Sequence, residues 1–71
     1  MNILIFATSV GSKEEVSRVQ PLLSSVEGIR KWTFDLEDCD KILRVVSKNI
    51  PARFIEELLQ KAGFVCDELK Y

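Results

Sequence analysis

Two kinds of hydrophobic pattern, one typical of strands and one typical of helices, follow each other along the chain. Their order constrains the fold more than any other feature of the sequence. Apolar residues alternate with polar ones, or run without a break, in four short segments, at 2–8, 30–36, 41–47 and 64–69. Such patterns are typical of β-strands. Two further segments, 13–26 and 54–62, carry apolar residues at helical spacing. The sequence therefore predicts six elements in the order strand, helix, strand, strand, helix, strand.

Turn and capping residues lie where this order needs them. Ser12 is a favourable N-cap for the first helix, and Glu15 three residues later completes a capping box. Gly28 follows the first helix and Gly63 the second, at positions where a glycine commonly ends a helix. The polar run 37–40 predicts a hairpin connection between the second and third strands.

For a chain of 71 residues, this order predicts one domain, residues 1–71, with a ferredoxin-like α+β fold. Right-handed crossovers place both helices on one face of a four-stranded antiparallel sheet. The second and last strands are then expected at opposite edges of the sheet. The loop before the first helix, the hairpin 37–40 and the turn at Gly63 are expected at one end.

The first strand is apolar on both faces, which is typical of a central strand. In the third strand, Leu43 and Val45 are predicted to face the helices because Arg44 between them is costly to bury. In the first strand, we expect the residues that meet the helices to be Ile3, Ile5 and Ala7.

The other apolar side chains of these two strands would then lie on the open face of the sheet. This candidate interaction face consists of Leu4, Phe6, Ile42 and Val46. Exposed apolar patches tend to mark partner surfaces. The alternative is that long side chains such as Lys31 and Arg44 cover the patch.

Composition excludes several classes of function. The formal net charge is −1, with both signs interspersed, which argues against nucleic acid or a membrane surface as the partner. The sequence has no histidine, which removes the commonest metal ligand and the usual general base. No Gly-rich phosphate loop is present. We therefore expect no catalytic residues, no cofactor and no enzyme activity.

The remaining features indicate an ordinary intracellular domain. The apolar run 3–7 is too short for a signal peptide or a membrane span, so the cytoplasm is the expected location. Two cysteines do not make a disulfide framework. The acidic pairs Asp38/Asp40 and Glu56/Glu57 are interpreted as solvated surface.

Over nearly its whole length the sequence resembles the heavy-metal-associated domains, the family that includes copper chaperones. Three pieces carry the resemblance in order: Val-Glu-Gly-Ile at 26–29, the alternating strand Lys-Trp-Thr-Phe-Asp-Leu at 31–36, and Lys-Ala-Gly-Phe at 61–64. The resemblance implies a ferredoxin-like fold. It also implies a soft-metal site in the first loop, which the family builds from a Cys-x-x-Cys motif.

In this register, the two metal-binding cysteines of the family fall on Ser12 and Glu15. A hydroxyl and a carboxylate are hard, weak ligands for a soft ion, so we interpret both residues as the helix cap and expect no metal ion at this loop. Cys39, between two acidic residues, is the alternative ligand; otherwise it is an exposed turn residue. Cys66 is interpreted as a small core residue.

The preferred hypothesis is a small non-catalytic interaction module that does not bind soft metal at the usual loop. Its partner would be another protein or a second copy of the chain. The rival hypothesis is atypical transition-metal binding or transport through Cys39 and its acidic neighbours. A third, a regulatory domain for a small molecule, has no residue that points to a ligand.

Overall fold

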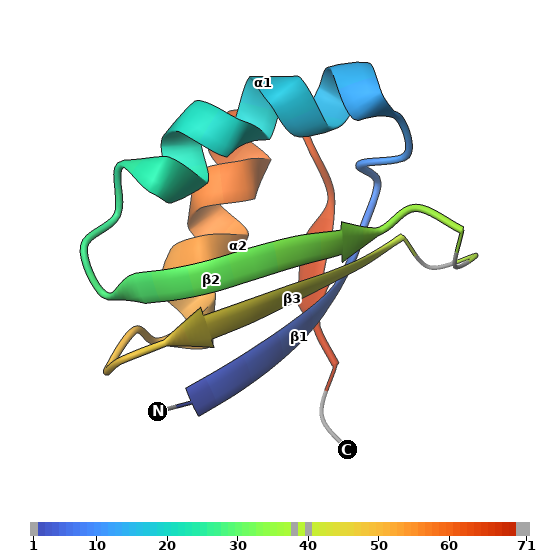
Figure 1. Ribbon diagram of the computed structural model, residues 1–71. Coiled ribbons are helices and arrows are strands. Elements are labelled where there is room, and N and C mark those ends of the chain that lie inside the picture. Colours follow the sequence, from blue (N-terminus) through green and yellow to red (C-terminus); the bar gives the residue numbers. More distant parts are fainter. Residues whose placement is uncertain (1, 38, 40, 70–71) are drawn as a thin grey trace.

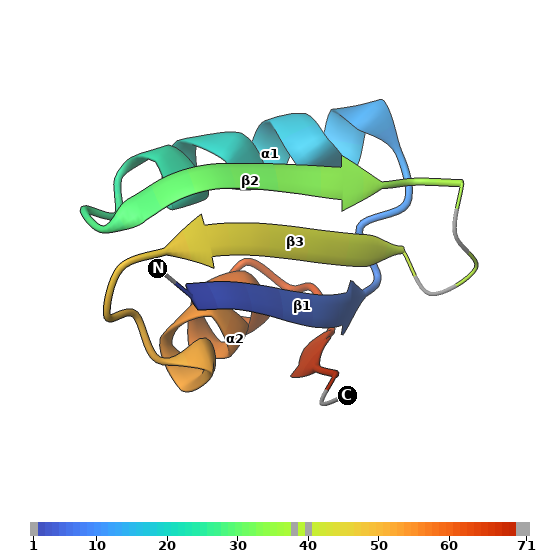
Figure 2. The ribbon, with the colours of Figure 1, turned by 60° about the horizontal axis from the view of Figure 1, so that its bottom comes forward.

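The computed structural model describes residues 2–37, 39 and 41–69, and it has the predicted order of elements. The strands are β1 (Asn2–Thr8), β2 (Ile29–Asp35), β3 (Ile42–Ser47) and β4 (Cys66–Glu68), and the helices are α1 (Lys13–Ser24) and α2 (Ala52–Lys61). Neighbouring strands are antiparallel in the order β2-β3-β1-β4. Both helices lie behind one face of this sheet (Figure 1; Figure 2). The ferredoxin-like fold is therefore confirmed.

The ends of several elements differ from the sequence prediction. The first helix was expected to reach Val26 but ends at Ser24, and the last strand is limited to Cys66–Glu68. The chain then turns at Gly28, whose φ is +99°. A Cβ at this position would lie 3.0 Å from Ile50 Cδ1 and 3.2 Å from the Lys48 carbonyl oxygen. Gly28 is thus required both for its left-handed backbone and for close packing.

The core lies between the sheet and the helices. Its buried members come from the sheet, the two helices and the loops at one end. They are Phe6, Leu43, Val45 and Cys66 from the sheet, Val19, Leu23, Ile55 and Leu59 from the helices, and Val10 and Phe64 from the loops. Leu43 and Val45 face the helices, as predicted.

The predicted facing of β1 is wrong. Phe6 is 0% exposed and Leu4 packs against the core, whereas Ile3 is 66% exposed. The reason is the register with β3, in which Ile5 lies opposite Arg44 and Phe6 lies opposite Leu43. Residues directly opposite each other in an antiparallel pair lie on the same face.

The open face therefore carries the other set of β1 residues. Ile42 lies opposite Ala7 and Val46 lies opposite Ile3, so both are on the open face, as predicted. Ile42 is nevertheless only 6% exposed. The corrected set of apolar residues on the open face is Ile3, Ile5, Ala7, Ile42 and Val46.

The two faces of β1 predict different mutational costs. Phe6→Ala removes a large side chain from the core and should lower the free energy of unfolding by about 3–5 kcal/mol. Ile3→Ala, on the same strand, should lower it by less than about 1 kcal/mol because the side chain is largely exposed. Urea unfolding of both variants measures the difference, and equal costs would contradict the facing described above.

Candidate functional site

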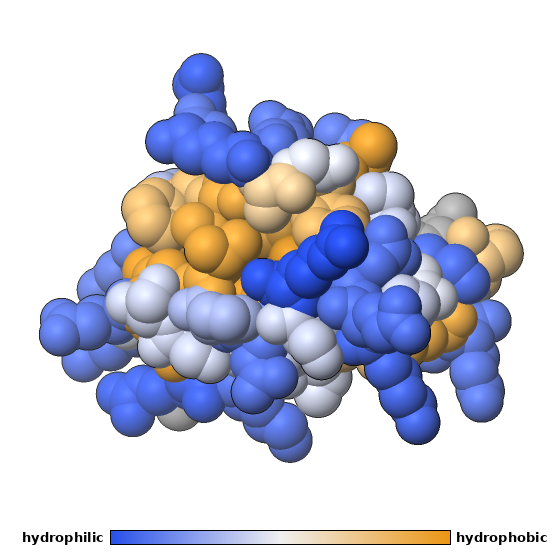
Figure 3. Space-filling view, turned by 90° about the horizontal axis from the view of Figure 1, so that it is seen from above, coloured by the Kyte–Doolittle hydropathy of each residue, from blue (hydrophilic) through white to orange (hydrophobic). Residues whose placement is uncertain are grey.

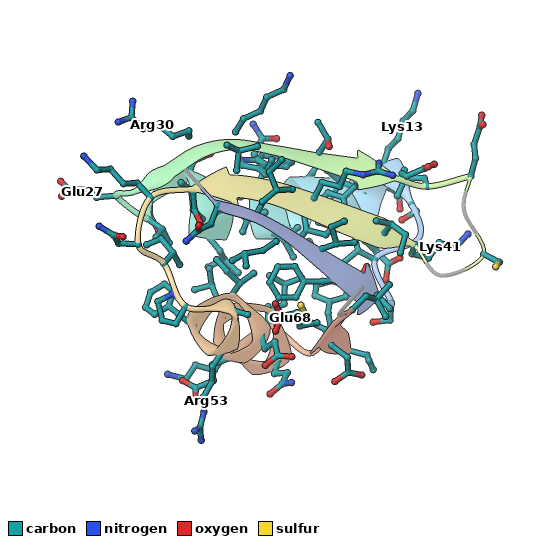
Figure 4. The ribbon with its side chains drawn as sticks, turned by 90° about the horizontal axis from the view of Figure 1, so that it is seen from below. Lys13, Glu27, Arg30, Lys41, Arg53 and Glu68 are labelled. Atoms are coloured by element: carbon teal, nitrogen blue, oxygen red, sulfur yellow. The ribbon has the colours of Figure 1, made fainter. Side chains whose placement is uncertain are left out.

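Three loops meet at one end of the sheet, as the sequence predicted. The Ser9 N–H donates to the Val65 carbonyl oxygen (3.1 Å), and the Val65 N–H donates to Ser9 Oγ (2.9 Å). These bonds join the loop before α1 to the loop before β4. The hairpin joins them through Lys41, because a Cβ on Gly11 would lie 3.3 Å from Lys41 Cε. Lys13 and Lys41 lie at this same end in Figure 4.

A second group of hydrogen bonds fixes the first loop to the hairpin. Thr8 Oγ1 donates to the Lys41 carbonyl oxygen (2.7 Å) and accepts from the Val10 N–H (3.2 Å). Val10 itself is fully buried. The Lys41 ammonium donates to the Leu36 carbonyl oxygen (3.1 Å), so its side chain bends back over its own hairpin. The path of the loop is thus set by packing and by hydrogen bonds within the protein.

Ser12 and Glu15 bond to each other at the start of α1. The Glu15 N–H donates to Ser12 Oγ (3.1 Å), and Ser12 Oγ donates to Glu15 Oε1 (3.4 Å). The same carboxylate oxygen accepts from the Gly11 N–H (3.0 Å). The predicted N-cap is confirmed: Ser12 Oγ satisfies an amide that the first turn of the helix leaves without a partner. Glu15 differs from the predicted capping box, because its carboxylate bonds to the N–H of Gly11, one residue before the N-cap.

This donor set does not fit a soft metal ion. Cu(I) and Zn(II) sites of this kind need thiolates, whereas one hydroxyl and one carboxylate oxygen here are already engaged in the cap. Within residues 2–37, 39 and 41–69, no three His, Cys, Asp or Glu side chains are grouped closely enough to hold a metal ion.

The two cysteines lie in different environments. Cys39 is exposed in the turn between β2 and β3, and Cys66 is fully buried in β4. β2 and β4 form opposite edges of the sheet, which are about 14 Å apart for strands about 4.8 Å apart. Burial raises the pKa of the Cys66 thiol to about 12, and Glu56 and Asp67 add to the increase. Cys66 is therefore a protonated core side chain at neutral pH. The acidic neighbours predicted to assist Cys39, Asp38 and Asp40, lie outside the described residues.

Sequence reasoning missed the role of Glu56 and Gln60. Glu56 was interpreted as solvated surface, yet its Oε2 accepts from the Glu68 N–H (2.8 Å). Gln60 Nε2 donates to the Cys66 carbonyl oxygen (3.3 Å). Both side chains reach from α2 to the backbone of β4. Their spacing of four residues on one helix is the signal that could have indicated a shared target.

Hydrophobic surface is present on both sides of the molecule. On the open face of the sheet, Ile3 is the most exposed large apolar residue. On the opposite side, Figure 3 shows a hydrophobic area surrounded by hydrophilic side chains. Phe54 of α2, expected in the buried stripe of that helix, is 45% exposed. No helix in the described part of the chain is long and apolar enough to cross a membrane.

No family model and no curated protein matches the sequence. Solved structures do match. The yeast copper transporter domain Ccc2a is 21% identical, with a TM-score of 0.84 over 99% of this chain and 97% of that domain. A copper-binding domain from the P-type ATPase HMA7 is 20% identical, with a TM-score of 0.84 over 99% and 96%. The first domain of the human copper chaperone for SOD1 is 24% identical, with a TM-score of 0.77 over 93% and 89%. The chain therefore has the fold of these copper-binding domains.

The raised pKa of Cys66 predicts an alkaline loss of stability. Above pH 9 the thiol ionises in the unfolded chain but stays protonated in the native protein up to about pH 12. Above pH 9 the native protein therefore keeps a proton that the unfolded chain has lost. The free energy of unfolding has its full value below pH 9 and falls as the pH rises, by up to about 1.4 kcal/mol per pH unit.

Other groups also titrate in this range, so the wild type should be compared with Cys66→Ala. Urea unfolding at several values between pH 7 and 10.5 should show the stability advantage of the wild type shrinking above pH 9. A constant difference between the two proteins would contradict the prediction.

Proposed function

We propose that this chain is a non-catalytic protein-interaction module with the fold of a copper-carrier domain, and that its first loop does not bind soft metal. The observation that carries the proposal is the mutual capping of Ser12 and Glu15. Where the resemblance implies two thiolates, these side chains stabilise the start of α1.

Contact with another protein is a role that such a fold can perform. One of the solved structures with this fold is the complex Atx1–Cu(I)–Ccc2a, in which two proteins and a Cu(I) ion are present together. By analogy of fold, this chain would contact another protein without a metal ion between them. The formal net charge of −1 supports a protein rather than a nucleic acid or a membrane surface as the partner.

The rival function is metal handling through Cys39. Its exposed thiol lies near the end of the sheet where the copper-binding motif is expected in the family. A single thiolate is a weak site unless a second chain supplies another one. The rival therefore requires either acidic co-ligands or two copies of the chain.

Cu(I) titration under reducing conditions separates the two functions. The wild type should not bind Cu(I) stoichiometrically with a dissociation constant of about 1 μM or lower. The double substitution Ser12→Cys with Glu15→Cys restores two thiols at the register of the family and should bind one Cu(I) tightly, although loss of the cap costs about 1 kcal/mol of stability. Tight binding by the wild type that Cys39→Ser abolishes would establish the rival instead.

Self-association through the open face is the second part of the proposal. The original candidate set included Leu4 and Phe6, which lie inside, so the surface consists of Ile3, Ile5, Ala7, Ile42 and Val46. A two-fold pair of such faces would bury the exposed Ile3 side chain.

If this face joins two copies, the wild type should sediment as a dimer at micromolar concentration. Ile3→Lys, which places a charge in the interface but outside the core, should yield a folded monomer with the circular dichroism of the wild type and a Tm that no longer depends on protein concentration. A wild type that stays monomeric up to millimolar concentration would remove the open face as a homodimer surface and leave the metal question untouched.

A further inference from the structure

The two outer strands of the sheet differ in how their backbone groups are satisfied. An outer strand presents a row of N–H and C=O groups that another chain can pair with. At β4, α2 blocks this row: Glu56 accepts from the Glu68 N–H (2.8 Å) and Gln60 donates to the Cys66 carbonyl oxygen (3.3 Å). Figure 4 shows Glu68 against α2. This edge is already closed from within the molecule.

No such protection exists at β2. Among residues 2–37, 39 and 41–69, no side chain hydrogen-bonds to the backbone of Ile29–Asp35. A β-bulge between Ile29 and Lys31 interrupts the regular register at the start of the strand. The remaining five residues, 31–35, are a regular edge that is free to pair.

Side chains along this edge alternate in character. Lys31 and Thr33 are exposed and Asp35 is half-buried, all on the open face, whereas Trp32 and Phe34 pack toward the helices. The two aromatic rings contact each other edge to face, with centroids 5.9 Å apart. Arg53–Glu57 is the only ion pair between described residues. Lys31 and Asp35 therefore form no ion pair with each other or with another described residue. One end of the edge is thus basic and the other acidic.

The position of α1 decides what kind of chain can pair there. In Figure 2, which faces the sheet, α1 lies along the outer side of β2. If two copies paired through β2, their β2 strands would be about 4.8 Å apart. Each copy would then bring its own α1 helix alongside the shared edge. A single extended segment brings no helix with it.

We propose that residues 31–35 of β2 bind an extended peptide segment as an added antiparallel strand. The segment carries apolar side chains opposite Trp32 and Phe34, an acidic one opposite Lys31 and a basic one opposite Asp35. Opposite charges that face each other across two strands stabilise the pairing, and like charges weaken it. This inference adds a surface for a partner segment, distinct from the open face, to the interaction module proposed above, and it rests on that function.

Two capped peptides test the register. The matched peptide, Lys-Val-Thr-Val-Glu, places its basic residue opposite Asp35 and its acidic residue opposite Lys31 when it runs antiparallel. The reversed peptide is Glu-Val-Thr-Val-Lys. Trp32 is the one tryptophan of the chain, so its fluorescence reports binding at this edge, and amide chemical shifts locate the contact. The matched peptide should bind the wild type about tenfold more tightly than the reversed one.

The variant Lys31→Glu with Asp35→Lys keeps the net charge and should reverse this preference. Lys61→Glu, an exposed change on α2, should leave the preference of the wild type unchanged. In an added strand, every second amide of the peptide points toward β2 and the others point away. N-methylation of the amides that point toward β2 should abolish binding, and N-methylation of the others should preserve it.

Several outcomes would overturn the inference. They are equal binding of both peptides, no binding at millimolar concentration, the opposite charge preference, or shifts confined to the open face or the first loop. Protection of the β2 amides in the absence of peptide that is lost on dilution, and that persists in the open-face variant Ile3→Lys at high concentration, would show that a second copy occupies the edge instead. The Cu(I) titration is independent of these results, so failure of the edge and failure of the metal-free function are separately visible.

Discussion

The pairing of β1 with β3 determines which side chains form the core. Arg44 cannot be buried without a partner, so β3 must present Leu43 and Val45 to the helices. The register then brings Phe6 opposite Leu43 and sends Ile5 to the side of Arg44. A shift of one residue would exchange the two faces of β1 and expose its aromatic ring. The helices, the three loops at the first-loop end and the outer strands all depend on this central pair.

Hydrogen bonds within the protein hold the first loop in place. In this protein, Glu15 satisfies the Gly11 N–H and bonds to Ser12, and Thr8 joins Val10 to the hairpin. The cap is a local interaction, whereas the bond from Thr8 to Lys41 joins residues far apart in the chain. The likeness to copper-binding domains concerns the backbone arrangement, and the side chains of Ser12 and Glu15 form the helix cap.

The edges of the sheet show a similar division of roles between elements. α2 covers β4 not only with apolar residues but also with Glu56 and Gln60, which take one donor and one acceptor of its backbone. In the described part of the chain, no side chain of α1 hydrogen-bonds to the backbone of β2. Another strand can therefore be added to the sheet at β2 more readily than at β4. This difference between the two edges supports the proposal that a partner strand binds at β2.

Much of this architecture follows from the sequence alone, because it depends on contacts between near neighbours. The hydrophobic periods gave the order of six elements, and Ser12 predicted the N-cap of the first helix. The facing of β1 could not be read in this way, since a strand that is apolar on both sides carries no internal preference and only its pairing with β3 selects one. The bonds from Glu56 and Gln60 to β4 also needed the tertiary structure, because their spacing places both side chains on one side of α2 but does not indicate which strand they meet. The same holds for the burial of Cys66: its environment, and hence its pKa, is set by elements that lie far away in the chain and close in space.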